Sequence, residues 1–324
     1  MPARIVPPLD RWPRRAYAAL RAACLSFRLG GHSLKPPPFE YHAPESLDEA
    51  LALLAAHGDD CRPLAGGQSL IPLLSFRLAR PAHLVDLNRA TGFPDIEGGA
   101  AGLSIGAMVR QRRAERSPVV REHCPLLSDA LALIGHPAIR NRGTVGGSIA
   151  HADPAAELPA VAVALDAGLV VRGPEGERTV RAADFFVGHY STDLQSDECL
   201  VRIDLPPWPP GAGWSIQETA RRHGDFAIAA VAAVVQLDGG GTVADARLAL
   251  AGVDDRPVRA SAAEAQLVGS VAGPAAFAAA AQQAAVGIDP PSDLHGSAAY
   301  RRHVVQVLVR RALEAASQRA EVRL

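Results

Sequence analysis

The chain has 324 residues, a formal net charge of −1 at pH 7, and 48% hydrophobic against 21% charged residues. This length allows about two globular domains, and the near-neutral charge favours neither nucleic acid nor an anionic membrane as a partner. No run approaches the ~18 uninterrupted apolar residues that suggest a membrane span. The four cysteines, Cys24, Cys61, Cys124 and Cys199, lie far apart with no C-x-x-C pair. We therefore expect a protein of a reducing cytoplasm that binds no iron–sulfur cluster or other metal in this chain.

Residues 1–34 differ in composition from the rest, with arginines around a short Ala/Leu stretch at Ala16–Leu25. Arg-rich amphipathic starts are typical of targeting segments. Three prolines interrupt this one, which favours a disordered extension or a misassigned start codon. We expect the folded protein to begin near Lys35.

Residues 35–90 read as a small β-α-β lobe. Phe39–His42 predicts a first strand, and a helix follows that Ser46 caps, because a serine side chain accepts a hydrogen bond from the first helical turn. Pro63–Ala65 predicts a second strand and His83–Asn88 a third.

Residues 91–210 predict a second lobe. The spacing of apolar residues indicates helices over Arg112–Arg121 and Leu126–Ile134, and alternation indicates a strand over Cys199–Leu205. The two lobes together make up the first expected domain, residues 35–210.

The clearest linker is the proline-rich segment Pro206–Gly211. Residues 211–324 predict a smaller domain in which a three-stranded sheet precedes two alanine-rich helices. The expected strands are Trp214–Thr219, Ile228–Gln236 and Ala246–Ala251, and the expected helices lie near Pro274–Ala285 and Ser297–Ala316. Strands followed by helices indicate the α+β class.

Two short segments, Ala65–Ser69 and Thr144–Ser148, each join two glycines to a following hydroxyl residue. Glycine lets backbone N–H groups turn toward a bound anion with no Cβ in the way, and serine adds a side-chain donor. One such segment is weak evidence, whereas two in one chain predict a diphosphate held from both sides, as in a dinucleotide such as FAD. A G-x-G-x-x-G fingerprint after the first strand is missing, so binding in the Rossmann manner is not expected.

Longer strings surround these glycines and recur later in the chain. They are Ala65–Pro72, Ile139–Ser148, His151–Pro159, Arg221–Ala227 and Tyr300–Arg302. With these strings the chain resembles the flavin-binding medium subunit of bacterial molybdenum hydroxylases, in the carbon monoxide dehydrogenase-like branch of the xanthine dehydrogenase family. The resemblance implies a two-lobed FAD domain of the vanillyl-alcohol-oxidase or PCMH type and a smaller C-terminal domain.

The resemblance also implies which residues touch FAD. The diphosphate contacts fall on two segments, Ala65, Gly66, Gly67, Gln68, Ser69 and Leu70, and Thr144, Val145, Gly146, Gly147 and Ser148. Glu157 matches a carboxylate that binds the adenosine ribose hydroxyls, although a carboxylate at the start of a helix also favours the helix dipole.

Three further positions match contacts to the flavin ring. Phe226 stands where many relatives have a tyrosine beside the ring, and the alternative is an aromatic residue of the domain core. Leu200 and Gln217 match contacts to the flavin edge, but the family has lysine where this chain has Gln217. His151 and Asp153 are interpreted as residues that shape the loop rather than as an acid–base pair.

The implied function is electron transfer. The chain would bind FAD, receive electrons from a small [2Fe-2S] subunit and deliver them to an external acceptor, while a large molybdopterin subunit oxidises the substrate. A dimer of such heterotrimers is expected, in the cytoplasm or at the inner membrane face through the complex. No catalytic residue is expected in this chain. The alternatives are a stand-alone FAD oxidase and a non-catalytic flavin-binding assembly module.

Overall fold

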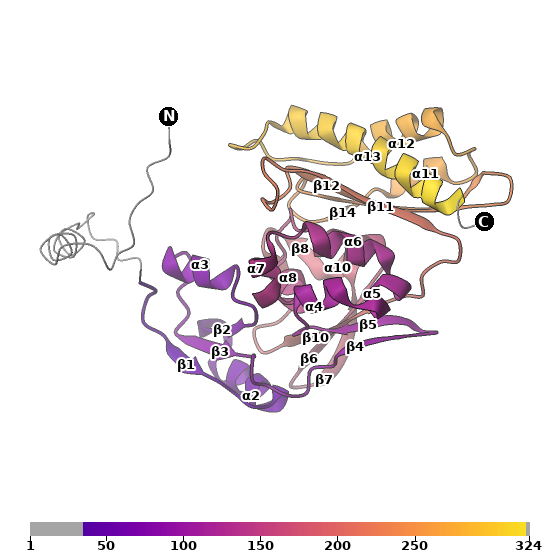
Figure 1. Ribbon diagram of the computed structural model, residues 1–324. Coiled ribbons are helices and arrows are strands. Elements are labelled where there is room, and N and C mark those ends of the chain that lie inside the picture. The colour runs from indigo at the N-terminus through magenta and orange to yellow at the C-terminus, as the bar shows by residue number, and fades with distance from the viewer. Residues whose placement is uncertain (1–34, 322–324) are drawn as a thin grey trace, which may run out of the picture.

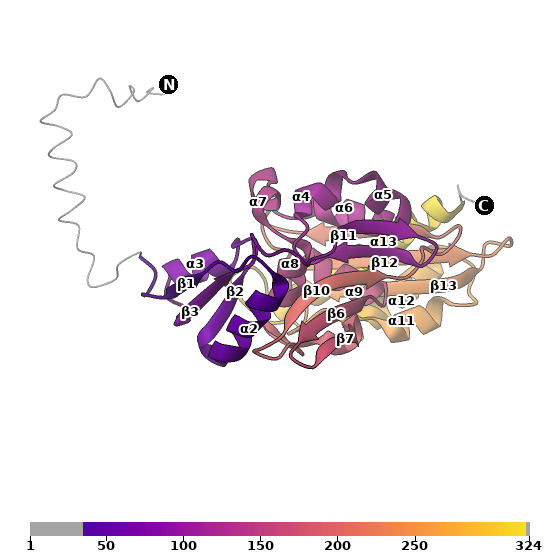
Figure 2. The same cartoon turned by 90° about the horizontal axis from the view of Figure 1, so that it is seen from below.

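A computed structural model describes residues 35–321 of the chain (Figure 1). The expectations for residues 1–34 fall outside this described part. The described chain forms a small parallel sheet, a larger antiparallel sheet and a C-terminal sheet, each with its own helices. Figure 2 shows the small lobe at one end of the molecule, with β13, α11 and α12 at the other.

The first lobe is the expected β-α-β unit, a parallel sheet in the order β1-β3-β2. Its elements are β1 (Glu40–His42), α2 (Leu47–His57), the 3-10 turn η2 (Gly58–Asp60), β2 (Cys61–Leu64), α3 (Leu70–Ser75) and β3 (His83–Asp86). Ser46 caps α2 as predicted, since its hydroxyl accepts a hydrogen bond of 3.1 Å from the Glu49 N–H. Apolar residues of α2 pack with Val170, Cys199 and Val201 of the second lobe, so a shared core joins the two lobes.

The second lobe is built on an antiparallel sheet in the order β4-β5-β10-β6-β7. Its strands are β4 (Ile96–Gly99), β5 (Gly102–Gly106), β6 (Gly168–Gly173), β7 (Gly176–Arg181) and β10 (Cys199–Leu205), and β8 (Phe186–Gly188) pairs separately with β9 (Ser191–Thr192). Its helices are α4 (Gln111–Arg116), α5 (Pro118–His123), α6 (Pro125–Leu133), α7 (Pro137–Arg142), α8 (Val145–His151), α9 (Glu157–Ala164) and α10 (Ala182–Phe185).

The prediction of a single helix over Arg112–Arg121 is wrong. The segment divides into α4 and α5 at Ser117 because Pro118 has no N–H to continue the ladder. The Ser117 hydroxyl then accepts a hydrogen bond from Val120 N and starts the second helix.

The C-terminal domain has a four-stranded antiparallel sheet, not the three-stranded sheet expected. Its strands are β11 (Gly213–Thr219), β12 (Ala229–Leu237), β13 (Val243–Ala251) and β14 (Val258–Arg259), and its helices are α11 (Ser261–Leu267), α12 (Pro274–Val286) and α13 (Ala298–Glu321). The fourth strand, β14, pairs with Ala249 and Leu250. It has two residues, too few to show alternation in a sequence, and that is why it was missed.

Alternation along β12 explains how the domains join. Ala229, Val231 and Ala233 face the core beneath the C-terminal helices. The residues between them, such as Ala230 and Ala232, lie in the core of the second lobe. Both faces of this strand are therefore buried, and the C-terminal domain is fixed onto the second lobe. Over residues 35–321, no helix has the length and apolarity to cross a membrane.

Candidate functional site

The first glycine segment, Ala65–Ser69, connects the end of β2 to the start of α3. Gly67 has a φ of 73°, a left-handed conformation that glycine adopts without strain. The segment lies at the carboxyl edge of the parallel sheet, next to the glycines of the second lobe.

The second glycine segment, Thr144–Ser148, is not a loop between strands. Thr144 is the N-cap of α8, and its hydroxyl accepts a hydrogen bond of 3.0 Å from Gly147 N. The preceding helix, α7, begins at Pro137, so helices and not strands flank this segment. A threonine followed by two glycines suits a helix start as well as it suits a turn, so the sequence pattern alone does not tell the two apart.

The structure brings the two segments into contact. A Cβ at Gly66 would lie 2.5 Å from the Arg142 carbonyl oxygen and 2.7 Å from the Gly143 Cα. A Cβ at Gly147 would lie 3.5 Å from the Ala65 Cβ and 2.5 Å from the Thr144 Oγ1. Gly66 is therefore required for the approach of one lobe to the other, whereas Gly147 is required by the Thr144 cap of its own segment.

Two polar side chains brace this contact, and sequence reasoning missed both. Asn88 Nδ2 donates a hydrogen bond of 3.0 Å to the Ala65 carbonyl, and Asn88 Oδ1 accepts one of 2.6 Å from Arg110. Arg110 also donates to the Arg142 carbonyl. Burial, and then the like charge of Arg142, lower the pKa of Arg110. Two guanidinium groups thus lie beside the glycine contact, where they favour an anion.

The two segments differ in the hydrogen bonds they have left to give. Within residues 35–321, no acceptor receives the backbone N–H groups of Gly66, Gly67, Gln68 and Ser69. In the second segment Val145, Gly146 and Ser148 donate to the carbonyls of Val109, Ala107 and Thr144, and Gly147 donates to the Thr144 hydroxyl. Apart from the Thr144 N–H, which has no described acceptor either, the free backbone donors of this site belong to the first segment.

Two carboxyl groups interact near the start of α9, that of the buried Glu157 and that of the half-buried Glu218. Glu157, the first residue of α9, is 5% exposed and forms no ion pair within the described part of the chain. Burial, the largest cause, and the charges of Glu218 and Asp153 raise the pKa of Glu157 to about 7. Burial also raises the pKa of Glu218 to about 6, and its Oε2 is buried without a hydrogen-bond partner among the described residues. Orphaned buried carboxyl oxygens indicate an absent donor.

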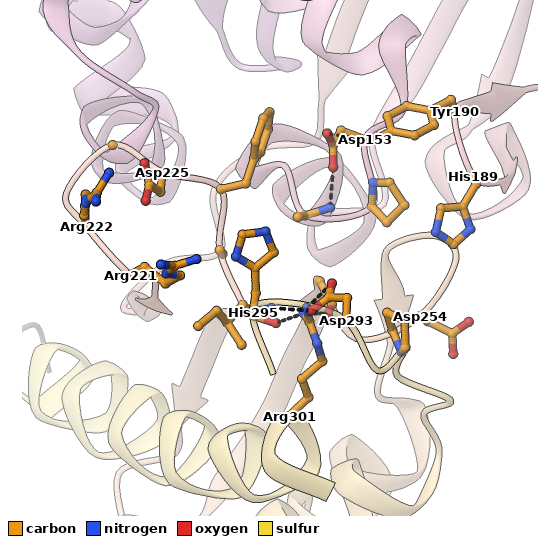
Figure 3. Close-up of a pocket in the computed structure, with 18 residues that line it drawn as sticks. Asp153, His189, Tyr190, Arg221, Arg222, Asp225, Asp254, Asp293, His295 and Arg301 are labelled. Carbon is orange, nitrogen blue, oxygen red and sulfur yellow. Dashed lines mark hydrogen bonds and ion pairs between the residues drawn. The ribbon is translucent and has the colours of Figure 1, made fainter. Parts of the chain in front are cut away.

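A pocket of about 610 Å³ opens where the second lobe meets the C-terminal domain (Figure 3). Asp153 and Tyr190 line the side formed by the second lobe, and the Tyr190 hydroxyl donates to Asp153 Oδ2 at 3.5 Å. Phe226 lines the same pocket and is 61% exposed, so it is not a core aromatic. His151, at the end of α8, lies 5.0 Å from the Tyr190 ring between centroids.

The loop that carries Phe226 rests against the segment leading into α7. Gly224 has a φ of 85°, and a Cβ there would lie 2.8 Å from the His136 ring and 3.1 Å from the Gly135 carbonyl carbon. His136 is therefore a packing partner of the Phe226 loop. Because α8 has seven residues, His151, which contacts the lining residue Tyr190, lies about 10 Å along the helix from the second glycine segment.

A buried arginine supports the far side of this pocket. Arg301 is 4% exposed and donates to the Gly252 carbonyl at 2.7 Å, to the Ile228 carbonyl, and to Asp293 at 2.7 Å. Burial would raise the pKa of Asp293, but hydrogen bonds from His295 and Arg301 outweigh it and hold that pKa low. These contacts fix the strand ends that carry the pocket loops.

Neither Leu200 nor Gln217 lines the pocket. Leu200 is 4% exposed and lies in the core of the second lobe, where β10 is irregular. Gln217 is half-buried in β11 and donates to the Ser215 hydroxyl at 3.1 Å. Arg140 is structural, since it is 5% exposed and bonds Glu115 at 2.8 Å.

Comparison with known proteins decides the family. Residues 37–208 match the family model described as the FAD binding domain in molybdopterin dehydrogenase, and residues 214–316 match the CO dehydrogenase flavoprotein C-terminal domain. The chain belongs to the FAD-binding medium subunits of molybdopterin dehydrogenases. It is thus a subunit of a multisubunit oxidoreductase with an FAD-binding domain, and the resemblance drawn from the sequence is confirmed.

Individual relatives match this chain over almost their whole length. The chain is 43% identical to the 6-hydroxypseudooxynicotine dehydrogenase complex subunit alpha of Paenarthrobacter nicotinovorans, over 89% of this chain and 97% of that one. It is 42% identical to the carbon monoxide dehydrogenase medium chain of Hydrogenophaga pseudoflava, over 87% and 98%. A chain of the solved carbon monoxide dehydrogenase of that organism superposes with a TM-score of 0.86 at 44% identity, covering 88% of this chain and 99% of the other.

Proposed function

We propose that this chain holds the FAD diphosphate at the contact between its two glycine segments and passes electrons through the flavin. The observation that carries the proposal is this contact, where Gly66 lets the lobes approach and four neighbouring N–H groups have no described acceptor. Backbone donors with the guanidinium groups of Arg110 and Arg142 beside them suit a diphosphate. The hydroxyls of Ser69 and Ser148 are further candidate donors.

The adenosine ribose would bind Glu157. A carboxylate accepts two hydrogen bonds from a vicinal diol, and Glu157 is buried without a cationic partner in the described residues. Glu218 lies close enough to raise its pKa and also has a buried oxygen without a donor. A bound diol would satisfy part of this pair, which supports the ribose role over that of a helix-start carboxylate.

The flavin ring would lie toward the pocket beside Phe226. An exposed aromatic side chain that lines a pocket offers its face for stacking, and phenylalanine does so without the hydroxyl of a tyrosine. Flavin takes up electrons singly and releases them as a pair, so the residues of this chain have only to hold and orient it. Leu200 and Gln217 would act as walls behind the ring, because neither lines the pocket itself.

The electron route follows from membership of a complex. Two relatives are named as a complex subunit and as a medium chain. We propose a small [2Fe-2S] subunit as the donor, an external acceptor, and a large molybdopterin subunit where the substrate is oxidised, arranged as a dimer of heterotrimers. Copurification should yield iron, molybdenum and FAD together. A flavoprotein that oxidises its own substrate without partner chains would refute this assignment. The cytoplasmic location stays a prediction.

The diphosphate site is tested by Gly66→Ala against the matched variant Gly99→Ala. A methyl group at Gly66 overlaps the backbone of Arg142 and Gly143, whereas at Gly99 nothing lies within 4 Å. We expect Gly66→Ala to lose at least ~10-fold in FAD affinity because the glycine contact opens, while Gly99→Ala keeps wild-type affinity. Circular dichroism of both apoproteins checks that the fold is kept. Full FAD content in Gly66→Ala would overturn the site.

A further inference from the structure

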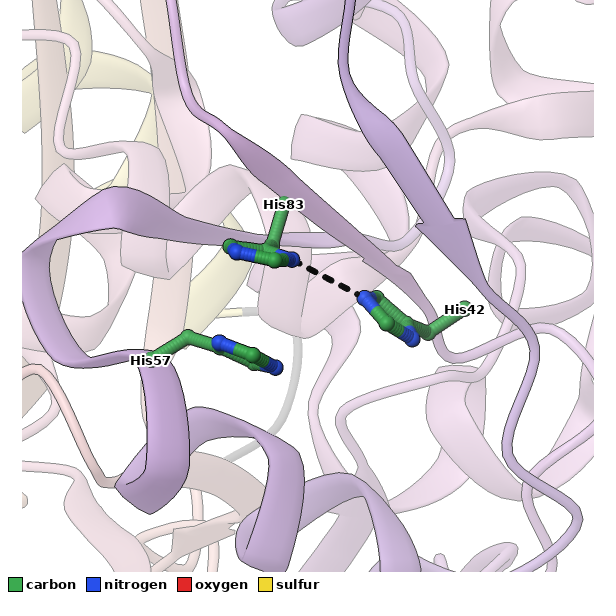
Figure 4. Close-up of side chains that lie close together, drawn as sticks. All are labelled: His42, His57 and His83. Atoms are coloured by element: carbon green, nitrogen blue, oxygen red, sulfur yellow. Dashed lines mark hydrogen bonds between the residues drawn. The ribbon is translucent and has the colours of Figure 1, made fainter.

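Three histidines that are far apart in the sequence meet on the first lobe, outside the flavin site (Figure 4). His42 ends β1, His83 begins β3, and His57 ends α2. In the register of the parallel sheet, Glu40 pairs with His83 and His42 with Val85, so His42 and His83 share the face of the sheet that carries Val85. Val85 packs in one core with apolar residues of α2, which places this face beneath that helix.

Each of the three imidazoles offers a nitrogen, and these nitrogens all lie within 4.8 Å of one another. His42 Nε2 and His83 Nδ1 are 3.1 Å apart. Two imidazole ligands with Zn–N bonds of 2.0–2.1 Å in a tetrahedral site stand about 3.4 Å apart, so this pair already has almost the spacing of two ligands.

The third imidazole is close and has no competing partner. The His57 ring stacks on the His83 ring, with centroids 3.6 Å apart and planes 17° apart. Within residues 35–321, no hydrogen bond to the His57 ring is present, so its nitrogens are free to turn toward the other two. Coordination needs a rotation of this side chain out of the stack, and its place at the last residue of α2 allows that.

The charges around the cluster favour a cation. The C-terminal end of α2 carries the negative end of the helix dipole, and His57 is its last residue. Glu40 Oε2 lies 3.5 Å from His83 Nδ1, and 68% of the Glu40 side chain is exposed. A carboxylate or water is thus available as a fourth ligand.

We propose that His42, His57 and His83 form a binding site for a divalent transition metal, with Zn²⁺ as the ion that three imidazoles suit best. The ion would tie the end of α2 to both strands and so fix the lobe that carries the first glycine segment. Its binding does not depend on the flavin assignment.

The test is isothermal titration of the full-length, FAD-loaded protein with ZnCl₂, beside His57→Gln and the control His303→Gln. His303 is an exposed histidine of α13. We expect one tightly bound Zn²⁺ per chain in the wild type and in His303→Gln, and an affinity at least ~10-fold lower in His57→Gln. His42→Gln provides a second variant should His57→Gln not fold, and it should show the same loss.

Two results would overturn the proposal. One is a wild-type protein that binds no stoichiometric Zn²⁺. The other is a His57→Gln or His42→Gln protein that binds Zn²⁺ as tightly as His303→Gln. The absorbance of bound FAD is read in the same samples and should be equal in all of them, so a failure of the metal site is distinguishable from a failure of the flavin site.

Discussion

FAD affinity should depend on pH through Glu157. Its carboxyl is 5% exposed and has a pKa of about 7, raised chiefly by burial. A ribose diol donates hydrogen bonds and therefore favours the ionised carboxylate. Binding of FAD should thus release a proton wherever the free protein holds Glu157 protonated, and affinity should rise with pH through the neutral range.

The size of the effect follows from the pKa. If only the ionised form binds, the fraction competent to bind is 1/(1 + 10^(7 − pH)) with the pKa of about 7. Between pH 6 and pH 8 this fraction rises from about 0.09 to about 0.9, so affinity should rise about tenfold. Fluorescence titration of the apoprotein with FAD, at constant ionic strength, measures this slope.

The variant Glu157→Gln should bind FAD more weakly and with little dependence on pH, because an amide does not titrate. The exposed residue Glu97 supplies the control Glu97→Gln, which should keep the wild-type slope. A wild-type affinity that is flat from pH 6 to pH 8 would refute the ribose role. So would a slope that persists unchanged in Glu157→Gln.

The Glu157 carboxyl should also make the stability of the apoprotein depend on pH. The folded protein holds the Glu157 proton up to a pKa of about 7, whereas the pKa of an unperturbed glutamate is 4.5. Between these values the folded state binds more protons than the unfolded state, so the free energy of unfolding falls as pH rises. The difference between the two pKa values corresponds to about 3 kcal/mol of unfolding free energy, and most of this stability is lost by pH 7. Glu157→Gln should flatten this part of the profile in urea unfolding.

Two further variants separate binding from folding. Phe226→Ala removes an exposed aromatic side chain that lines the pocket, so it should change the absorption spectrum of bound FAD. The free energy of unfolding should stay within about 0.5 kcal/mol of wild type. An unchanged spectrum would place the flavin ring elsewhere. Arg301→Leu removes hydrogen bonds to the Ile228 and Gly252 carbonyls and to Asp293. It should lower the free energy of unfolding in urea by about 3 kcal/mol. A loss below about 1 kcal/mol would show that Arg301 is not needed for these contacts.

Much of the fold could be predicted because local patterns decide it. Cys199–Leu205 is a strand over the expected residues, and Ser46 caps the expected helix. The elements that were missed lack such a local signal. β14 has two residues, too few to show alternation, although residues 252–257 before it are rich in turn-forming glycine, aspartate and proline.

The candidate site could be predicted from the sequence only where the residue types are unusual. Double glycines are visible in a sequence, whereas Asn88 and Arg110 are common polar residues whose role depends on contacts across the lobes. Glu218 lies on a strand with no motif around it, and only burial beside Glu157 makes it notable. The three histidines of the proposed metal site are separated by 14 residues and more, so no ligand spacing shows them.

The two glycine segments look equivalent in the sequence, but their physical roles differ. In the first, four successive N–H groups have no described acceptor, so its backbone is suited to bind the anion. In the second, the N–H of Gly147 is used by the Thr144 cap, and a Cβ there would meet that cap and Ala65. A substitution at Gly147 would therefore weaken FAD binding by disturbing the start of α8. It would do so without removing a donor to the phosphates, which is why a glycine pair alone does not tell a binding loop from a packing contact.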